Sequence, residues 1–206
     1  MERHEPADIP GFGGGWHLEA SRGLLWEGTL EPMGGAFGRG GVARLGAFVL
    51  RPYRRGGLVR HLNERTYPGP GRFQRELEVH RALWEAGLPT VEPMGCAWRR
   101  HAWGVEGLYI TRWMAGDPWP RNWEGADWGE LSRILKALST WGCWAPDLNA
   151  TNVFLAEGGI RVLDFDRATF QPTGGLEERY LGRLHRSLVK LGAPHSLQQQ
   201  VAGGLI

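Results

Sequence analysis

The 206-residue sequence has few cysteines, almost no lysine and no long apolar run. No stretch approaches the roughly 18–20 apolar residues that span a bilayer, and the first residues lack the basic and apolar regions of a secretory signal. Cys96 and Cys143 stand in unrelated contexts, which favours reduced thiols in a cytosolic protein over a disulfide. The seven histidines lack metal-ligand spacing, so we expect no zinc site.

The formal net charge of +2 is too small to indicate a nucleic-acid partner. Lysine occurs only at Lys136 and Lys190, so arginine carries nearly all of the positive charge. Arginines gather in RPYRRGGLVRHLNER (51–65), and most of the eleven tryptophans lie between Trp84 and Trp144. This combination suits a membrane interface or an acidic amphiphile. A solvated face over an aromatic core would explain it as well.

The order of short motifs along the chain predicts an α+β protein in two lobes. Strand-like runs fill the first third (WHLEA, GLLWEG, VARLG and AFVLRPY), and MGGAFGRGGV (33–42) has the composition of a turn. Apolar residues at spacing 4, 3, 4 predict a helix over 72–86, with Glu76 bordering its apolar stripe. Two further runs, CAWRR and GVEGLYITRWM, predict a hairpin. A second helix begins with a capping box of Asp127 and Glu130, and a third covers 176–191.

Acidic and amide side chains surround a predicted hairpin in WAPDLNATNVFLAEGGIRVLDFDRA (144–168). VFL and IRVL are β-prone and AEGG is turn material, so a hairpin centred near residue 158 places Asn152 opposite Asp164. Asp147 lies on the loop that leads into this end. Such oxygen donors suit Mg²⁺, and phosphoryl transfer also needs a separate carboxylate to accept a hydroxyl proton. A polar loop capped by asparagines is the alternative.

Two motifs of this stretch, DLNATN (147–152) and LDFDRA (163–168), resemble those of the 3-deoxy-D-manno-octulosonic acid (Kdo) kinases, a group of lipopolysaccharide kinases. GRGGV (38–42), VLRPYRRGGLV (49–59), RELEVHRALWEAGLPTVEP (75–93) and LGRLHRSLVKLG (181–192) are similar to that family too. The resemblance runs over most of residues 34–192. It implies an α+β, protein-kinase-like, two-lobed fold. Residues 1–111 would form a β-rich N-lobe with one helix, and residues 112–206 a reduced, mainly helical C-lobe.

The resemblance also implies roles for single residues of the second half. Asp147 would be the catalytic base that orients or deprotonates the acceptor hydroxyl. Asn152 and Asp164 would hold Mg²⁺. Asp166 takes the glycine position of the D-F-G motif; on a continuing strand it would share a face with Asp164 and support the metal, or it would hold Arg167 instead.

In the first half, the resemblance assigns nucleotide binding to five residues. Arg51 takes the place of the phosphate-anchoring lysine and pairs with Glu76, while Gly38, Gly40 and Gly41 offer backbone N–H groups to phosphate. Composition supports the first assignment independently. Because no lysine precedes Lys136, an arginine must supply the cation if this is a kinase. Guanidinium binds phosphate bidentately and keeps its proton.

We therefore expect ATP-dependent phosphorylation, with Mg²⁺, of a hydroxyl on a Kdo residue of a lipid A precursor, in lipopolysaccharide core biosynthesis. The family alone implies the 4-hydroxyl. The acceptor is acidic and membrane-anchored, which suits four arginines and the nearby tryptophans: Arg54, Arg55, Arg60 and Arg65. The protein would act in the cytoplasm, peripherally on the inner membrane.

Two alternatives remain open. GLPTVEP also resembles small-molecule kinases of the aminoglycoside or choline type, although Asn149 stands where those enzymes usually have histidine. A catalytically inactive pseudokinase is the other alternative, because Ala145 replaces the histidine expected two residues before Asp147 and the usual lysine is missing. Retention of Asp147, Asn152 and Asp164 argues against it.

Overall fold

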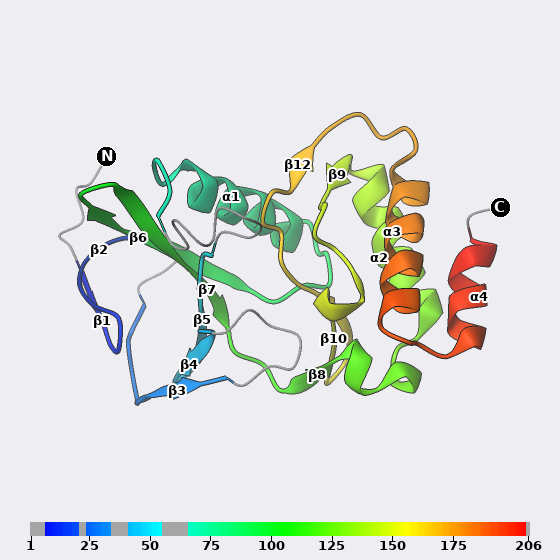
Figure 1. The fold of residues 1–206 in the computed structure, drawn as a ribbon, viewed down its shortest axis with the longest axis horizontal. Coiled ribbons are helices and arrows are strands. Elements are labelled where there is room, and N and C mark those ends of the chain that lie inside the picture. The colour runs from blue at the N-terminus through cyan, green and yellow to red at the C-terminus, as the bar shows by residue number, and fades with distance from the viewer. Residues whose placement is uncertain (1–6, 21–23, 34–40, 55–65, 205–206) are drawn as a thin grey trace. The chain divides into compact units, whose positions relative to one another are not determined.

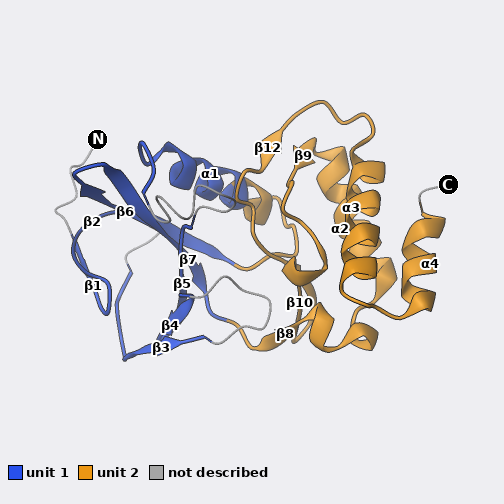
Figure 2. Ribbon diagram, in the orientation of Figure 1, with its two compact units in different colours: residues 1–81, 92–113 blue, residues 82–91, 114–206 orange. Residues whose placement is uncertain are grey.

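The computed structural model describes residues 7–20, 24–33, 41–54 and 66–204 (Figure 1). It contains two compact units (Figure 2): the first takes residues 1–81 and 92–113, and the second takes residues 82–91 and 114–206. The lobe boundary expected between residues 111 and 112 stays a prediction.

The first unit is built on a seven-stranded antiparallel sheet with the order β1-β2-β6-β7-β5-β4-β3. The strands are β1 (Ala7–Ile9), β2 (Gly13–Ala20), β3 (Leu30–Pro32), β4 (Ala43–Leu45), β5 (Phe48–Pro52), β6 (Pro93–His101) and β7 (Gly104–Arg112). The predicted helix is α1 (Gly71–Glu85). Within GLLWEG, the described residues 24–28 do not form the expected strand: Leu24 and Trp26 pack on the apolar core of the sheet without joining its ladder, and β3 begins at Leu30.

Alternation along the strands gives the sheet two apolar faces. Leu108 and Ile110 of β7 belong to one cluster, whereas Tyr109 between them belongs to a second cluster with Phe73 and Leu77 of α1. Arg51 of β5 lies directly opposite Tyr109 in the ladder. Because facing residues in a ladder share a side of the sheet, Arg51 lies on the side that α1 covers.

The second unit is mainly helical, with α2 (Trp128–Thr140), α3 (Leu176–Lys190) and α4 (His195–Gly203). Its strands are short: β8 (Gly116–Pro118), β9 (Cys143–Trp144), β10 (Val153–Ala156), β11 (Gly159–Val162) and β12 (Thr169–Phe170). Single 3₁₀ turns occur at η2 (Trp119–Arg121), η3 (Trp123–Gly125) and η4 (Ala150–Asn152). The sheet-rich first unit and the helical second unit confirm the α+β, protein-kinase-like fold class.

The start of α2 differs from a reciprocal capping box. The Asp127 carboxylate caps the helix by accepting from the N–H of Gly129 at 2.8 Å. Glu130 instead accepts from the N–H of Ile160 at 3.1 Å, which ties α2 to β11. Its carboxylate is therefore used in tertiary packing.

Both cysteines are free and buried. Burial raises the pKa of the Cys96 thiol, and it raises the pKa of the Cys143 thiol to about 12. Over the described residues, no helix combines the length and apolarity needed to cross a bilayer.

Candidate active site

The hairpin of β10 and β11 forms as expected, but its register is one residue away from the prediction. Val153 pairs with Val162, and the ladder continues where the N–H of Leu163 donates to the carbonyl of Asn152 at 2.8 Å. Asn152 therefore lies opposite Leu163, and Asp164 follows one residue later. The turn contains only Glu157 and Gly158, because Ala156 and Gly159 already pair.

Asp164 leaves the ladder through an unusual backbone conformation. Its φ is +66° and that of Arg167 is +65°, a left-handed region that residues with a side chain rarely adopt. The expected strand through Asp166 is therefore wrong, since β11 ends at Val162 and the chain turns. The N–H of Asp166 faces Oδ1 of Asp164 at 3.4 Å, and Phe165 between them is fully buried. Such strain is concentrated at functional sites.

The loop before the hairpin is held by two asparagine side chains. Nδ2 of Asn149 and Nδ2 of Asn152 both donate to the backbone carbonyl of Asp147, each at 2.8 Å. Oδ1 of Asn149 accepts from the N–H of Thr151 at 2.8 Å. The asparagines therefore do cap the loop. Of the two ends of the Asn152 amide, only the NH₂ can donate to a carbonyl. The bond to Asp147 therefore fixes which way the amide faces and leaves Oδ1 of Asn152 as an oxygen ligand.

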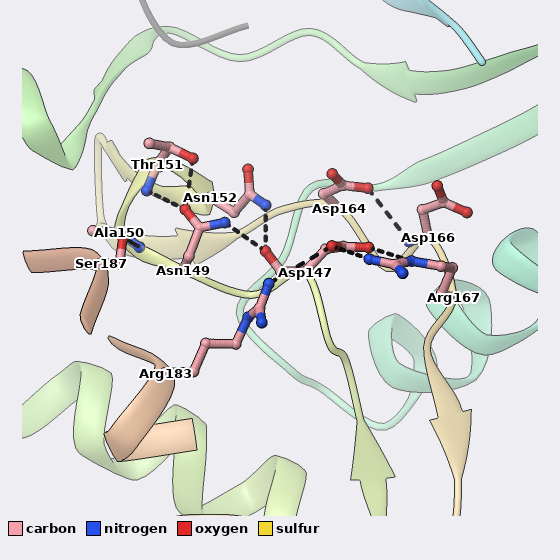
Figure 3. A network of polar contacts seen from close by, with 10 residues as sticks. All are labelled: Asp147, Asn149, Ala150, Thr151, Asn152, Asp164, Asp166, Arg167, Arg183 and Ser187. Carbon is pink, nitrogen blue, oxygen red and sulfur yellow. Dashed lines mark hydrogen bonds and ion pairs between the residues drawn. The ribbon is translucent and has the colours of Figure 1, made fainter. Parts of the chain in front are cut away.

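The residues expected to hold Mg²⁺ fit that ion in their chemistry. Figure 3 shows the amide of Asn152 and the carboxylate of Asp164 on the same side of the network, next to Asp147. Among the described residues, no group of three or more His, Cys, Asp or Glu side chains could hold a metal ion. Magnesium usually takes one or two carboxylates and fills its other positions with water and substrate phosphate. Asp166 lies beside Asp164 in Figure 3.

The carboxylate of Asp147 faces two arginines (Figure 3). Nε of Arg167 donates to Oδ2 at 2.9 Å and Nη2 donates to Oδ1 at 2.5 Å, while Nη2 of Arg183 lies 3.8 Å from Oδ1. The sequence indicated a cation among these carboxylates. At Asp147 that cation is Arg167, which reaches back from the turn after Asp164.

A tyrosine supports the loop where a histidine was expected. The hydroxyl of Tyr180, on α3, accepts from the N–H of Ala145 at 2.8 Å and donates to the carbonyl of Cys143 at 2.7 Å. Burial raises the pKa of Tyr180, so the hydroxyl keeps the proton that it donates. Seven residues later, Oγ of Ser187 accepts from the N–H of Ala150 at 3.2 Å. Helical periodicity alone places Tyr180 on the apolar face of the helix predicted over 176–191, although a buried tyrosine hydroxyl usually needs a partner.

Replacing Tyr180 with phenylalanine should lower kcat about tenfold and leave the KM for ATP nearly unchanged. The ring stays, but a buried N–H and a buried carbonyl lose their partner, which costs about 1–3 kcal/mol of unfolding free energy and loosens the loop that carries Asp147. Steady-state kinetics and chemical denaturation measure the two effects.

Ser139→Ala is the matched control, because it removes another buried hydroxyl bond of this unit, to the carbonyl of Leu135 at 2.8 Å, without touching the loop. An unchanged kcat in Tyr180→Phe, or an equal loss in Ser139→Ala, would show that Tyr180 does not position the loop.

In the first unit, Arg51 meets the buried carboxylate of α1. Nη2 of Arg51 donates to Oε1 of Glu76 at 2.5 Å, and the hydroxyl of Tyr53 donates to Oε2. Burial and the neighbouring Glu76 raise the pKa of Tyr53. Glu76 is 2% exposed, whereas the Arg51 side chain is 29% exposed between the rings of Tyr53 and Tyr109. Arg51 thus pairs with a buried carboxylate while its side chain stays partly exposed.

The glycine-rich turn is only partly described. Gly41 has φ +103°, a backbone conformation that residues with a side chain rarely adopt, so a larger residue there would be strained. Gly38 and Gly40 lie outside the described residues, as do Arg55, Arg60 and Arg65.

The strand-to-helix ion pair, the aspartate loop and the hairpin followed by Asp-Phe are the parts of a protein-kinase-like phosphotransferase. A sequence profile of the lipopolysaccharide kinase (Kdo/WaaP) family matches residues 26–202. The chain belongs to this family and is a kinase that transfers a phosphoryl group to a hydroxyl.

Two relatives of known name match this chain over most of its length. The 3-deoxy-D-manno-octulosonic acid kinase of Xanthomonas campestris pv. campestris (strain B100) is 31% identical over 202 residues, covering 92% of this chain and 72% of the relative. The enzyme of the same name from Stenotrophomonas maltophilia (strain R551-3) is 32% identical over 195 residues, covering 84% and 75%. The crystal structure of monomeric WbdD aligns with a TM-score of 0.48 at 19% identity, over 79% of this chain and 39% of that one.

Proposed function

We propose that this protein transfers the γ-phosphoryl group of ATP to a hydroxyl, at position 4, of a Kdo residue on a lipid A precursor, in lipopolysaccharide core biosynthesis. Membership of the Kdo/WaaP family and the names of its relatives support the reaction class and the acceptor. The observation that carries the proposal is the bond from Nδ2 of Asn152 to the carbonyl of Asp147. It joins the residue assigned to the metal to the residue assigned to the proton.

Asp147 is the general base in this proposal. Its carboxylate has about four lone-pair positions, of which Arg167 uses one on each oxygen, so an acceptor hydroxyl still has a place to donate. Asp147 aligns that hydroxyl and takes its proton as the oxygen attacks. Most of the rate acceleration in such a reaction comes from positioning and charge stabilisation.

Asn152 and Asp164 would hold Mg²⁺, with Asp166 next to them. When bound, the ion neutralises charge on the phosphates of ATP. Arg51 binds a phosphate group through its exposed part, and Glu76 fixes its orientation from the buried side. Gly38, Gly40 and Gly41 would offer backbone N–H groups to the phosphates.

The decisive experiment offers Mg-ATP with a Kdo-bearing lipid A precursor and, in parallel, with an aminoglycoside, followed by mass spectrometry of both products. We expect a gain of one phosphate on the Kdo residue, and fragmentation to assign it to position 4. Phosphate on the aminoglycoside alone identifies a small-molecule kinase. Absence of Mg-dependent ATP consumption at every acceptor concentration identifies a pseudokinase.

We also propose that the protein works on the cytoplasmic face of the inner membrane, in peripheral contact. The hairpin between β6 and β7 offers one element for this contact. Trp103 at its tip is 89% exposed, and Arg100 and His101 beside it are exposed too. Tryptophan favours the headgroup region, and an arginine next to it favours an anionic surface.

Replacing Trp103 with serine should weaken binding to phosphatidylglycerol-containing vesicles about tenfold, which corresponds to roughly 1.4 kcal/mol of binding free energy. The loss arises because the variant no longer transfers part of an indole ring from water into the membrane interface. Vesicle co-sedimentation at low salt measures the change. Leu25→Ser is the control, because Leu25 is also strongly exposed and apolar but lies outside this hairpin. Equal binding by wild type and Trp103→Ser would remove the hairpin from the membrane contact.

A further inference from the structure

Helix α3 presents three polar side chains to the loop that carries Asp147. Tyr180, Arg183 and Ser187 are spaced by three and four residues, which places them along one face of the helix. Tyr180 and Ser187 each bond to the backbone of this loop, through Ala145 and Ala150. These bonds fix the position of α3, and with it the base of the Arg183 side chain, against the loop.

The bonding of Arg183 is incomplete. Its Nη2 is 3.8 Å from Oδ1 of Asp147, beyond hydrogen-bond distance, and that oxygen already accepts from Arg167 at 2.5 Å. Its Nε is buried and has no hydrogen-bond partner. A buried donor without a partner costs about 1–3 kcal/mol, so such a group needs an explanation. The Arg183 side chain is 34% exposed, so part of it is open to solvent.

We propose that Arg183 binds an oxyanion of the acceptor, a carboxylate or a phosphate, beside the catalytic carboxylate. This inference rests on the proposed function, in which the acceptor is an acidic sugar lipid. The guanidinium is a planar fork that matches either group bidentately. Binding there brings the hydroxyl of the same sugar to Asp147, and the anion also screens the two neighbouring guanidinium charges from each other.

Arg183→Gln tests the assignment through the split between kcat and KM. We expect the KM for the acceptor to rise about 10–100-fold, the range for losing a charged hydrogen-bonded pair, with the KM for ATP unchanged. Arg183→Lys keeps the positive charge but not the planar fork of donors, so its KM for the acceptor should lie between those of wild type and Arg183→Gln. Arg186→Gln is the control, because Arg186 is on the same helix but exposed. Thermal unfolding shows whether each variant is folded.

Modified acceptors identify the anion. A Kdo-lipid with its carboxylate converted to the amide and a dephosphorylated Kdo-lipid are compared with the intact acceptor, in both wild type and Arg183→Gln. The group that Arg183 binds is the one whose removal weakens wild type but not the variant. If Arg183→Gln instead lowers kcat equally for all acceptors at unchanged KM, the arginine acts only through Asp147 and the proposal is wrong.

Equilibrium binding of the intact Kdo-lipid without ATP separates this inference from the proposed function. Wild type that binds the lipid through Arg183 but transfers no phosphate overturns the proposed function and leaves the anion site in place. Wild type that transfers phosphate while Arg183→Gln binds the lipid equally well overturns the anion site alone.

Discussion

Replacing Asp147 with asparagine should lower kcat about 10²–10⁴-fold, the range typical of general acid–base catalysis, while the dissociation constant for ATP stays close to wild type. Asparagine matches aspartate in shape, so the loop bonds to the Asp147 carbonyl from Asn149 and Asn152 can persist. The amide cannot take the hydroxyl proton, and it accepts from Arg167 through one oxygen only. Single-turnover assays and nucleotide binding by calorimetry measure the two quantities.

Asp117→Asn is the control for Asp147→Asn. Asp117 is also paired with an arginine, Arg121 at 3.2 Å, but it is exposed on β8. Exposed ion pairs contribute about 0–1 kcal/mol, so this variant should match wild type in both activity and stability. If Asp147→Asn keeps most of the wild-type kcat, another group takes the proton and the assignment of the base is wrong.

Several elements of this fold could be predicted because they follow from a local pattern. The apolar period of 3.6 residues located α1 and α3, and turn residues between two β-prone runs located the hairpin of β10 and β11. Its register could not be predicted to one residue, because AEGG contains four residues that can all occupy a turn. The chain uses Glu157 and Gly158, and the difference moves Asp164 out of the ladder.

The support of the active-site loop could not be predicted, because its contacts join distant parts of the chain. Tyr180 reaches Cys143 and Ala145 across about 35 residues of sequence. Local periodicity shows that a tyrosine faces the core, but it cannot show which backbone group its hydroxyl meets. The clamp of Arg167 on Asp147 depends on the left-handed backbone at Arg167, which has no signature in the sequence.

Arg51 was assigned by the family resemblance, and composition rather than periodicity supported that assignment. The first 135 residues contain no lysine, so an arginine had to supply any cation for phosphate in the first unit. Sheet alternation then explains its position: opposite Tyr109 on the side covered by α1, Arg51 meets the buried Glu76. Arginine suits this pairing, because its guanidinium carries five N–H donors in a planar fork that matches carboxylate and phosphate groups.

Replacing Arg51 with methionine should therefore lower kcat/KM for ATP about 100-fold, which corresponds to roughly 2.7 kcal/mol of transition-state stabilisation. The loss combines the missing phosphate contact with the loss of the ion pair to the buried Glu76, whose carboxylate still accepts from the hydroxyl of Tyr53. Arg51→Lys should recover part of the activity, because an ammonium group replaces the charge but not the second donor. Steady-state kinetics with ATP as the varied substrate measures both variants.

Arg44→Met serves as the control for Arg51→Met. Arg44 lies on the neighbouring strand β4, and its guanidinium stacks on the ring of Trp113. Glu76→Gln tests whether Glu76 positions Arg51. This variant keeps the shape of the side chain and the charge of Arg51 but loses the ion pair, so it should raise the KM for ATP. If Arg51→Met binds and uses ATP as well as wild type does, then the ion pair with Glu76 is structural only. Some other group must in that case neutralise the phosphates.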